Sequence, residues 1–262
     1  MVNNSMSVPK RRCRRKAILL FLLSYLFFLL VTLPASLVLT QLPLPQSISL
    51  MNIRGTLWQG EIGELHWQGL SLRQVHWNIL FSRLWLGMPS VAVSIHDPDT
   101  LVANADIGWR GSWQINELAL SIPATALQQQ LPYPLPAQVE GTLHLNIGQL
   151  RFDTAQCLAL ADAKAEWQSA SLQTPVGELP LNSVHASLHC PRHDTFELNA
   201  NQQSAALQSQ LTLRLNSAGT YQLQTTLTPG GELSDDIRAS LEWLGTKDDL
   251  GRIRIKNDGR WY

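Results

Sequence analysis

The sequence predicts a mainly β protein, in which an N-terminal transmembrane helix is followed by an antiparallel β domain of two related strand modules with one or two short helices. Three observations lead to this expectation. A long run of residues near the N-terminus carries no charge. Much of the remaining chain alternates apolar with polar or small residues over short stretches. One glycine-containing phrase occurs twice, 86 residues apart.

The first element is the N-terminal helix. Residues 10–16 read KRRCRRK, and the 24 residues that follow, 17–40, carry no charged side chain. At a rise of 1.5 Å per residue, such a helix reaches about 36 Å, more than the ~30 Å hydrocarbon core of a bilayer. Basic residues beside a membrane helix stay in the cytoplasm. We therefore expect a cytoplasmic tail at residues 1–16, a transmembrane helix at residues 17–40 and an exported remainder. A cleaved signal peptide, whose apolar core is shorter, and a buried core helix are the alternatives.

The charge distribution limits the classes of partner that the exported part is expected to bind. The first 40 residues hold six of the 20 basic side chains and none of the 20 acidic ones, so the remaining 222 residues carry a formal net charge of −6. Nonspecific nucleic-acid binding depends on a positive surface, and we expect no nucleic-acid partner. Beside an apolar helix, the basic block sets topology and touches anionic lipid.

Cysteine usage fits an exported domain. Cys13 lies in the basic tail, whereas Cys157 and Cys190 lie in the exported part. Because thiols pair in oxidising compartments, we expect a disulfide between Cys157 and Cys190. Two buried free thiols are the alternative.

The exported part begins with a proline-marked linker at residues 41–53, and β patterns dominate after it. Period-two alternation occurs in VAVSI at 91–95, LALSI at 118–122, LTLRL at 211–215 and YQLQTTL at 221–227. This alternation is typical of half-buried antiparallel strands with one apolar and one wet face. One short helix is expected within residues 123–131, and another, of about ten residues, after the capping residue Ser234.

The repeated phrase suggests two modules. With one residue of slack, GTLWQGEIGELHW at 55–67 aligns with GTLHLNIGQLRF at 141–152, so that Gly55 matches Gly141, Gly63 matches Gly148 and Trp67 matches Phe152. Glycine within a strand marks a bulge, a bend or a tight turn. We interpret the phrase as one structural unit written twice, which gives a first β module at 54–140 and a second at 141–262. Independent strand patterning of two unrelated stretches is the alternative.

Tryptophans gather in the first module, where six of the nine lie between residues 58 and 113. One interpretation is packing between strands, which aromatic residues favour. The other is a contact region, formed by Trp58, Trp67, Trp77 and Trp85, that faces a partner subunit, an apolar groove or the membrane rim, where tryptophan suits a half-wet boundary.

No catalytic signature is present, and neither an enzyme nor a cofactor is expected. The chain lacks the G-x-S-x-G, H-E-x-x-H and phosphate-loop patterns. The run His185–His189–Cys190–His193 has metal-ligating residue types, but a strand would point Cys190 away from the two histidines that precede it. Asp97 and Asp99 flank a proline and are typical of a turn. No metal site is predicted.

Several of these stretches resemble the type II (general) secretion pathway protein N family. They are the basic-then-apolar N-terminus, GTLWQGEIGELHWQGLSLRQVHWNI at 55–79, the pair Cys157 and Cys190, and LEWLGTKDDLGRIRIKNDG at 241–259. The resemblance implies a single-pass inner-membrane protein of Gram-negative bacteria with a periplasmic domain. It also implies an accessory role, by contact with other secretion subunits, in the export of folded proteins across the outer membrane. The family supplies no catalytic residues.

A weaker resemblance links the duplicated strands to AsmA-like envelope proteins, which implies a lipid-binding or lipid-transfer module as the alternative function. The two functions predict different surfaces. A lipid-holding groove requires apolar residues on an open concave face. A subunit that acts by protein contact predicts a closed core and a partner patch.

Overall fold

The computed structural model describes residues 10–41, 45, 47–67, 70–85, 87–129, 137–154 and 156–260. The helices in this part are α1 (Lys10–Val31), α2 (Ala35–Leu39), α3 (Phe81–Leu84), α4 (Ala124–Gln129) and α5 (Asp235–Glu242). The strands are β1 (Ile48–Gly55), β2 (Gln59–Trp67), β3 (Leu70–Ile79), β4 (Ser90–Asp97), β5 (Leu101–Trp109), β6 (Trp113–Pro123), β7 (Gln138–Asp153), β8 (Gln156–Thr174), β9 (Gly177–Arg192), β10 (Thr195–Gln203), β11 (Leu207–Asn216), β12 (Thr220–Pro229), β13 (Thr246–Lys247) and β14 (Ile253–Arg260).

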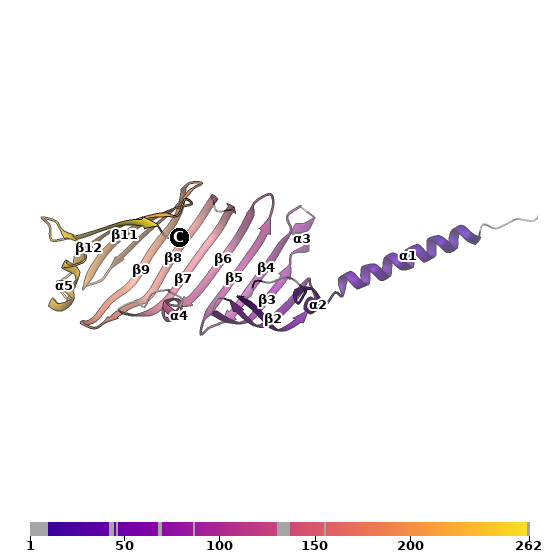
Figure 1. Ribbon diagram of the computed structural model, residues 1–262, viewed down its shortest axis with the longest axis horizontal. Helices are drawn as coiled ribbons and strands as arrows, with labels where there is room; N and C mark the ends of the chain where they lie inside the picture. Colours follow the sequence, from indigo (N-terminus) through magenta and orange to yellow (C-terminus); the bar gives the residue numbers. More distant parts are fainter. Residues whose placement is uncertain are drawn as a thin grey trace, which may run out of the picture.

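All fourteen strands belong to one antiparallel sheet. Strands β1 to β12 lie side by side in chain order, and β14 and then β13 complete the row. Figure 1 shows this row, with α1 pointing away from the β1 end and α5 beside the β12 end. The predicted mainly β, antiparallel fold with few helices is confirmed. Because each of the strands β1 to β12 pairs with the strand that precedes it in the chain, the sheet grows in one direction and forms a long single layer.

Buried apolar side chains form two clusters, one toward each end of the sheet. The cluster near α1 is built from β2, β3, β5 and β6 and consists of Ile62, Leu72, Val75, Leu101, Ala103 and Ile122. The far cluster forms where Ile237 and Leu241 of α5 pack with Ile253 of β14 and with residues of β9. Helix α5 begins where predicted, because the Ser234 hydroxyl accepts the Ile237 N–H at 3.4 Å.

Three neighbouring strands break the period-two alternation together at Gly63. Asn52 of β1 and Gln74 of β3 face this glycine from either side, and both have left-handed backbones, with φ of 57° and 54°. The apolar residues of each strand are therefore spaced by three at this point, in the pairs Leu50 and Ile53, Ile62 and Leu65, and Leu72 and Val75, yet all six pack in one cluster. Since the three strands skip in step, their register is kept without an extra residue, unlike in a β-bulge.

The same arrangement recurs at Gly148. Glu117 of β6 and Asp162 of β8 face this glycine and are left-handed, with φ of 52° and 51°. Apolar residues are again spaced by three, in the pairs Ile115 and Leu118, Ile147 and Leu150, and Leu160 and Ala163. We name β1–β3 the first triplet and β6–β8 the second triplet. Their central glycines are those that the repeated phrase aligns.

The N-terminal segment differs from the single helix expected at residues 17–40. Helix α1 ends at Val31, and a second short helix, α2, starts after Pro34, whose ring does not fit a helix interior. In the part of the chain that the structure describes, no helix has the length and apolar character needed to cross a membrane. Strand β1 also starts at Ile48, within the expected linker, and the expected module boundary at residue 141 falls inside β7.

Candidate interaction surfaces

One face of the sheet carries an unbroken row of apolar and small side chains. Each member is the cross-strand partner of the next, so the row runs across thirteen strands from β1 to β14. We call it the apolar row: Ile53, Ile62, Val75, Ile95, Ala103, Leu120, Leu145, Ala165, Ala186, Ala200, Leu211, Thr225 and Ile255. From Leu120 onward every member is half-buried. Ala126 of α4 packs against the cluster that Leu120 joins, and α5 belongs to the cluster that Ile255 joins. Among the described residues, the row members from Leu145 to Thr225 belong to neither cluster.

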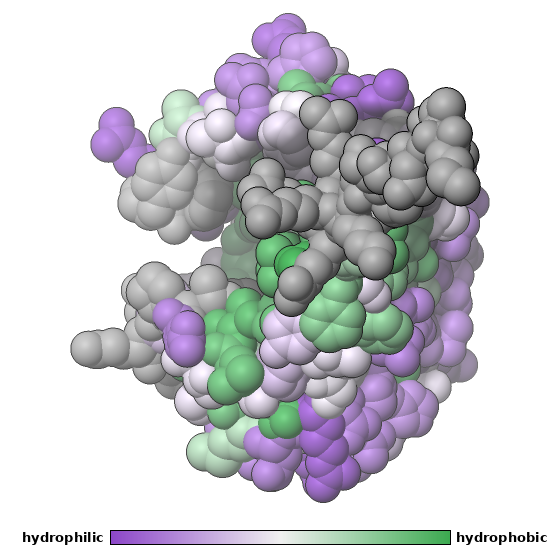
Figure 2. All heavy atoms as spheres, turned by 90° about the vertical axis from the view of Figure 1, so that its right-hand side faces the viewer, coloured by the Kyte–Doolittle hydropathy of each residue, from purple (hydrophilic) through white to green (hydrophobic). Residues whose placement is uncertain are grey.

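An open hollow is seen at the α1 end of the sheet (Figure 2). Figure 2 looks along the sheet from the α1 side and shows hydrophobic residues in the depth of an open hollow and hydrophilic residues around its outside. Three successive members of the row, Ala165, Ala186 and Ala200, are alanines, so the middle of the floor has short side chains. An open apolar face of this kind is what the groove expectation requires, whereas a closed core would have covered it.

The opposite face is polar and held by ion pairs. A shallow hollow of about 450 Å³ on β10–β12 includes Glu197, Arg214 and Gln222 among its lining residues. Asn199 donates a hydrogen bond to Glu197 at 2.8 Å, and the Arg214 guanidinium donates another at 2.7 Å. These hydrogen bonds, that of Asn199 first, hold the pKa of the Glu197 carboxyl below its usual value. Glu197 and Arg214 are thus paired with each other within the sheet.

Two of the four candidate tryptophans fasten the N-terminal helices to the sheet. The Trp58 indole N–H donates to the Leu30 carbonyl in the last turn of α1 at 2.9 Å, and the Leu57 N–H donates to the Leu33 carbonyl at the same distance. The Trp77 indole in turn donates to the Leu57 carbonyl at 3.1 Å. Both tryptophans are half-buried. Their role in the structure is to fix the turn between β1 and β2 against the end of α1.

The other two candidates lie apart from this pair. Trp85 follows α3 and is 93% exposed. Trp67 ends β2 at the opposite end of that strand, and its side chain lies outside the described part of the structure. Sequence reasoning overlooked the aromatic pair Trp109 and Trp113, which face each other across the β5–β6 turn and are each about half exposed. Their signal was a W-x-x-x-W spacing around Gly111, which suits a turn.

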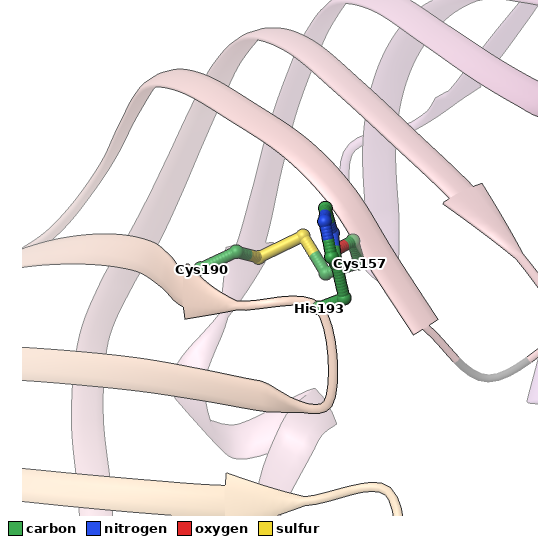
Figure 3. The surroundings of a disulfide bond; sticks show 3 residues. All are labelled: Cys157, Cys190 and His193. Carbon is green, nitrogen blue, oxygen red and sulfur yellow. A yellow bond between two sulfur atoms is a disulfide. The ribbon is translucent and has the colours of Figure 1, made fainter.

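The structure contains the predicted disulfide between Cys157 and Cys190, with the two Cα atoms 6.2 Å apart (Figure 3). The ladder between β8 and β9 ends at the pair Lys164 and Ser187, so the bridge joins the two strands beyond their last paired residues. Hydrogen bonds between Cys157 and His193 strengthen this connection, because the Cys157 N–H donates to the His193 carbonyl at 2.9 Å. Beyond the pair Lys164 and Ser187, β8 and β9 separate and leave a split in the sheet, and the disulfide joins the two strands across it.

The histidine-rich run on β9 has structural partners. His193 lies beside the Cys157 carbonyl, at 3.2 Å from Nδ1, and His185 lies 4.0 Å from the Glu166 carboxylate. Within the described chain, no three His, Cys, Asp or Glu side chains gather closely enough to hold a metal ion. The two aspartates of the expected turn share Arg73. Asp97, almost fully buried, accepts from its Nε at 3.2 Å, and Asp99 accepts from its Nη2 at 3.3 Å.

Comparison with known proteins places these features in a family. The family model of type II secretion system (T2SS) protein N matches residues 46–256. The chain is 30% identical to the type II secretion system protein N of Vibrio cholerae serotype O1 over 246 residues, which cover 92% of this chain and 96% of the relative. It is 34% identical to that of Aeromonas hydrophila over 244 residues, with 92% and 96% covered. It is 32% identical to that of Pectobacterium carotovorum over 239 residues, with 91% and 94% covered.

No solved structure matches the chain. The family match covers the sheet from β1 to the first half of β14, including both triplets and the disulfide. The relatives align over nearly their full lengths, so the match is not confined to one shared segment. The chain belongs to the family of type II secretion system protein N.

Proposed function

We propose that this secretion-system component is an accessory, single-pass inner-membrane subunit whose sheet lies in the periplasm. It acts through protein–protein contacts during the export of folded proteins across the outer membrane. Its partners are other subunits of the secretion system, and lipid contacts its N-terminal segment. The observation that carries the membrane attachment is the apolar surface of α1, whose side chains from Ile18 to Val31 are all exposed and, Ser24 aside, hydrophobic.

Such a surface requires apolar surroundings. The apolar part of α1, residues 17–31, gives about 22 Å of helix, and the rest of the charge-free run continues through α2. Within an approximately 30 Å hydrocarbon layer, both helices are needed to reach the far side. The basic block at residues 10–16 favours the orientation with the N-terminus in the cytoplasm.

A topology experiment tests the attachment. Alkaline phosphatase fused after Tyr262 is expected to be active, since the enzyme requires export. A reporter that works only in the cytoplasm is expected to be silent at the same position. Activity of the cytoplasmic reporter would refute the orientation.

A second candidate function is lipid binding, and the half-buried apolar row favours it. Thirteen strands contribute to a continuous floor of apolar and small side chains, and its members from Leu145 to Thr225 are only half-buried and lie outside both core clusters of the described chain. Acyl chains would remove this surface from water at about 25 cal/mol for each Å² covered. A subunit that acts only through protein contacts has no need for a floor that extends across the entire sheet.

Crosslinking in cells separates the two functions. A photoreactive residue replaces either Leu145, on the apolar row, or its neighbour Asn146, which points to the polar face. Capture of a secretion subunit, together with reduced export when the gene is deleted, supports the proposed function. Capture of lipid at position 145 but not at 146 supports lipid binding. Normal secretion with altered envelope lipids in the deletion strain would favour the second candidate over the first.

A further inference from the structure

Exposed aromatic and apolar side chains gather along one edge of the sheet near α1, where this edge is formed by the ends of strands β3 to β6 and not by an outermost strand. They come from the β3–β4 connection, which contains α3, and from the β5–β6 turn. We define the aromatic rim as Phe81, Leu84, Trp85, Trp109 and Trp113. The two connections touch, because the Trp109 N–H donates to the Pro89 carbonyl at 3.1 Å and Arg83 pairs with Asp106 at 3.0 Å. The rim is therefore one continuous surface.

The aromatic rim is continuous with the end of α1. The Trp58 ring contacts the Phe81 ring with centroids 5.3 Å apart, and the same Trp58 donates its indole N–H to the Leu30 carbonyl of α1. One aromatic ring thus separates the rim from the last turn of the apolar helix. The apolar surroundings of α1 therefore extend close to the aromatic rim.

The composition of the rim fits a bilayer boundary. Tryptophan combines a large apolar body with one N–H donor and gathers at the headgroup level of membranes. Arg110 stands between Trp109 and Trp113, and its guanidinium contacts the Met88 sulfur at 3.7 Å. It forms no ion pair with any side chain in the described residues, which leaves its charge available for lipid phosphate.

We propose that the aromatic rim lies in the headgroup layer of the bilayer that takes up α1, so that this edge of the sheet rests on the membrane surface. The inference depends on the membrane attachment proposed above. A rigid link between α1 and the first hairpin, made by Leu57 and Trp58, holds the edge in this position. The hollow at the α1 end of the sheet then lies next to the membrane surface (Figure 2).

Spin labels measure this placement on the full-length chain. Cys13→Ser removes the tail thiol, and Trp85→Cys or Trp243→Cys adds one labelling site. Trp243 is the matched control, because it is 91% exposed but follows α5 at the opposite end of the sheet. A third label at Val176→Cys samples the other edge, in the β8–β9 turn. Mass spectrometry checks that the Cys157–Cys190 bridge is intact in each variant.

The labelled proteins are reconstituted in vesicles of phosphatidylethanolamine and phosphatidylglycerol. Electron paramagnetic resonance then compares the collision rates of each label with oxygen, which enters the bilayer, and with a water-soluble nickel complex. A several-fold higher oxygen-to-nickel ratio at position 85 than at 243 and 176 is expected. Equal ratios in protein that floats with the vesicles would overturn the rim placement and leave the attachment standing.

Two further outcomes are also informative. Protein that is washed off the vesicles by carbonate refutes the membrane attachment and, with it, the rim. A label at position 85 that is shielded from both oxygen and nickel reports a protein contact, which refutes the bilayer as the occupant of the rim.

Discussion

The two triplets share a construction but differ in what they hold. In both, a central glycine is flanked by left-handed residues on the neighbouring strands. In both, a tryptophan on the third strand, Trp77 or Trp167, donates its indole N–H to a backbone carbonyl. Each of these rings also lies against a glycine of the middle strand, Gly60 or Gly141, where no Cβ would fit. We infer that the triplets are copies of one unit.

The differences follow from their positions in the sheet. The first triplet is the end of the sheet, has strands of eight to ten residues and is fastened to α1 and α2 through Trp58. The second lies within the sheet, and its β7 and β8 have 16 and 19 residues. Gly55 closes a hairpin, whereas the aligned Gly141 lies within β7 opposite a bulge. The shared parts keep apolar residues on one face, and the variable parts connect the sheet to its neighbours.

The largest expected effect is a difference in stability loss between alanine variants of Gly55 and Gly141, the glycines that open the two copies of the repeated phrase. A Cβ at Gly141 would lie 2.4 Å from the Gln168 carbonyl oxygen, at a φ of +102°. Overpacking costs about 1–3 kcal/mol and a left-handed backbone about 1–2 kcal/mol, so Gly141→Ala should lower the free energy of unfolding by about 2–5 kcal/mol. Gly55→Ala should cost less, because its nearest approach, to the Gln59 carbonyl oxygen, is longer, at 2.6 Å.

Chemical denaturation of the purified chain measures both variants. Gly111→Ala is the matched control, since its φ is also positive, +72°, and an added Cβ meets nothing within 4 Å. If Gly141→Ala is no more destabilising than this control, the close approach of the Gln168 carbonyl oxygen to Gly141 does not contribute to the stability.

The disulfide is the next largest difference, because it reinforces only the side of the second triplet. It closes a loop with a sequence separation of 33, which corresponds to about 3–4 kcal/mol in the chain-entropy model. Replacing both cysteines by serine should speed hydrogen exchange in β8–β10 and leave β1–β3 unchanged. Cys13→Ser serves as the control. Equal acceleration in both regions would mean that the split at β8 and β9 is not a local weak point.

Sequence patterns predicted the β class, the disulfide, helix α5 and the matched glycines Gly63 and Gly148. They did not reveal why those glycines are needed, because the reason lies on neighbouring strands. Asn52 and Gln74 face Gly63 only through the register of the sheet. In the sequence alone, the apolar residues spaced by three therefore resemble an irregularity in the period-two pattern. Likewise, the sequence left both strand packing and a contact region open for Trp58 and Trp77, and it gave no sign that their indoles donate to backbone carbonyls.

The long-range features were hidden for the same reason. The apolar row takes one residue from each of thirteen strands, and no local window contains two of its members in register. The aromatic rim joins two connections that are adjacent only because β4 and β5 pair. Helix α1 stops where Pro34 and the β1–β2 turn meet, which depends on residues 24 positions apart along the chain.

A smaller effect compares the two central glycines. A Cβ at Gly63 would lie 2.8 Å from the Asn52 Cβ, and one at Gly148 would lie 3.0 Å from the Asp162 Cβ. Gly63→Ala is therefore expected to cost about 1–3 kcal/mol and Gly148→Ala less. Combining Gly63→Ala with Asn52→Gly removes the clashing atom and should restore most of the loss in a double-mutant cycle. Additive losses in the cycle would show that the two positions are not in contact in solution.

The smallest effect tests the left-handed residues themselves, Gln74 in the first triplet and Asp162 in the second. Replacing either by glycine removes a strain of about 1–2 kcal/mol but adds a chain-entropy cost of about 0.5–1 kcal/mol, so the stability should stay level or rise by up to about 1.5 kcal/mol. Glycine at Ser71, a position of β3 without a left-handed backbone, is the control. It should lower the stability by at least about 0.5–1 kcal/mol, because it also removes the hydroxyl that lies 2.7 Å from His66 Nδ1. Gln74→Val should be destabilising, because a β-branched side chain tolerates the left-handed region least. Thermal unfolding followed by tryptophan fluorescence ranks the variants. If Gln74→Gly is as damaging as Ser71→Gly, the first triplet does not hold a left-handed residue at this position, and its likeness to the second triplet fails there.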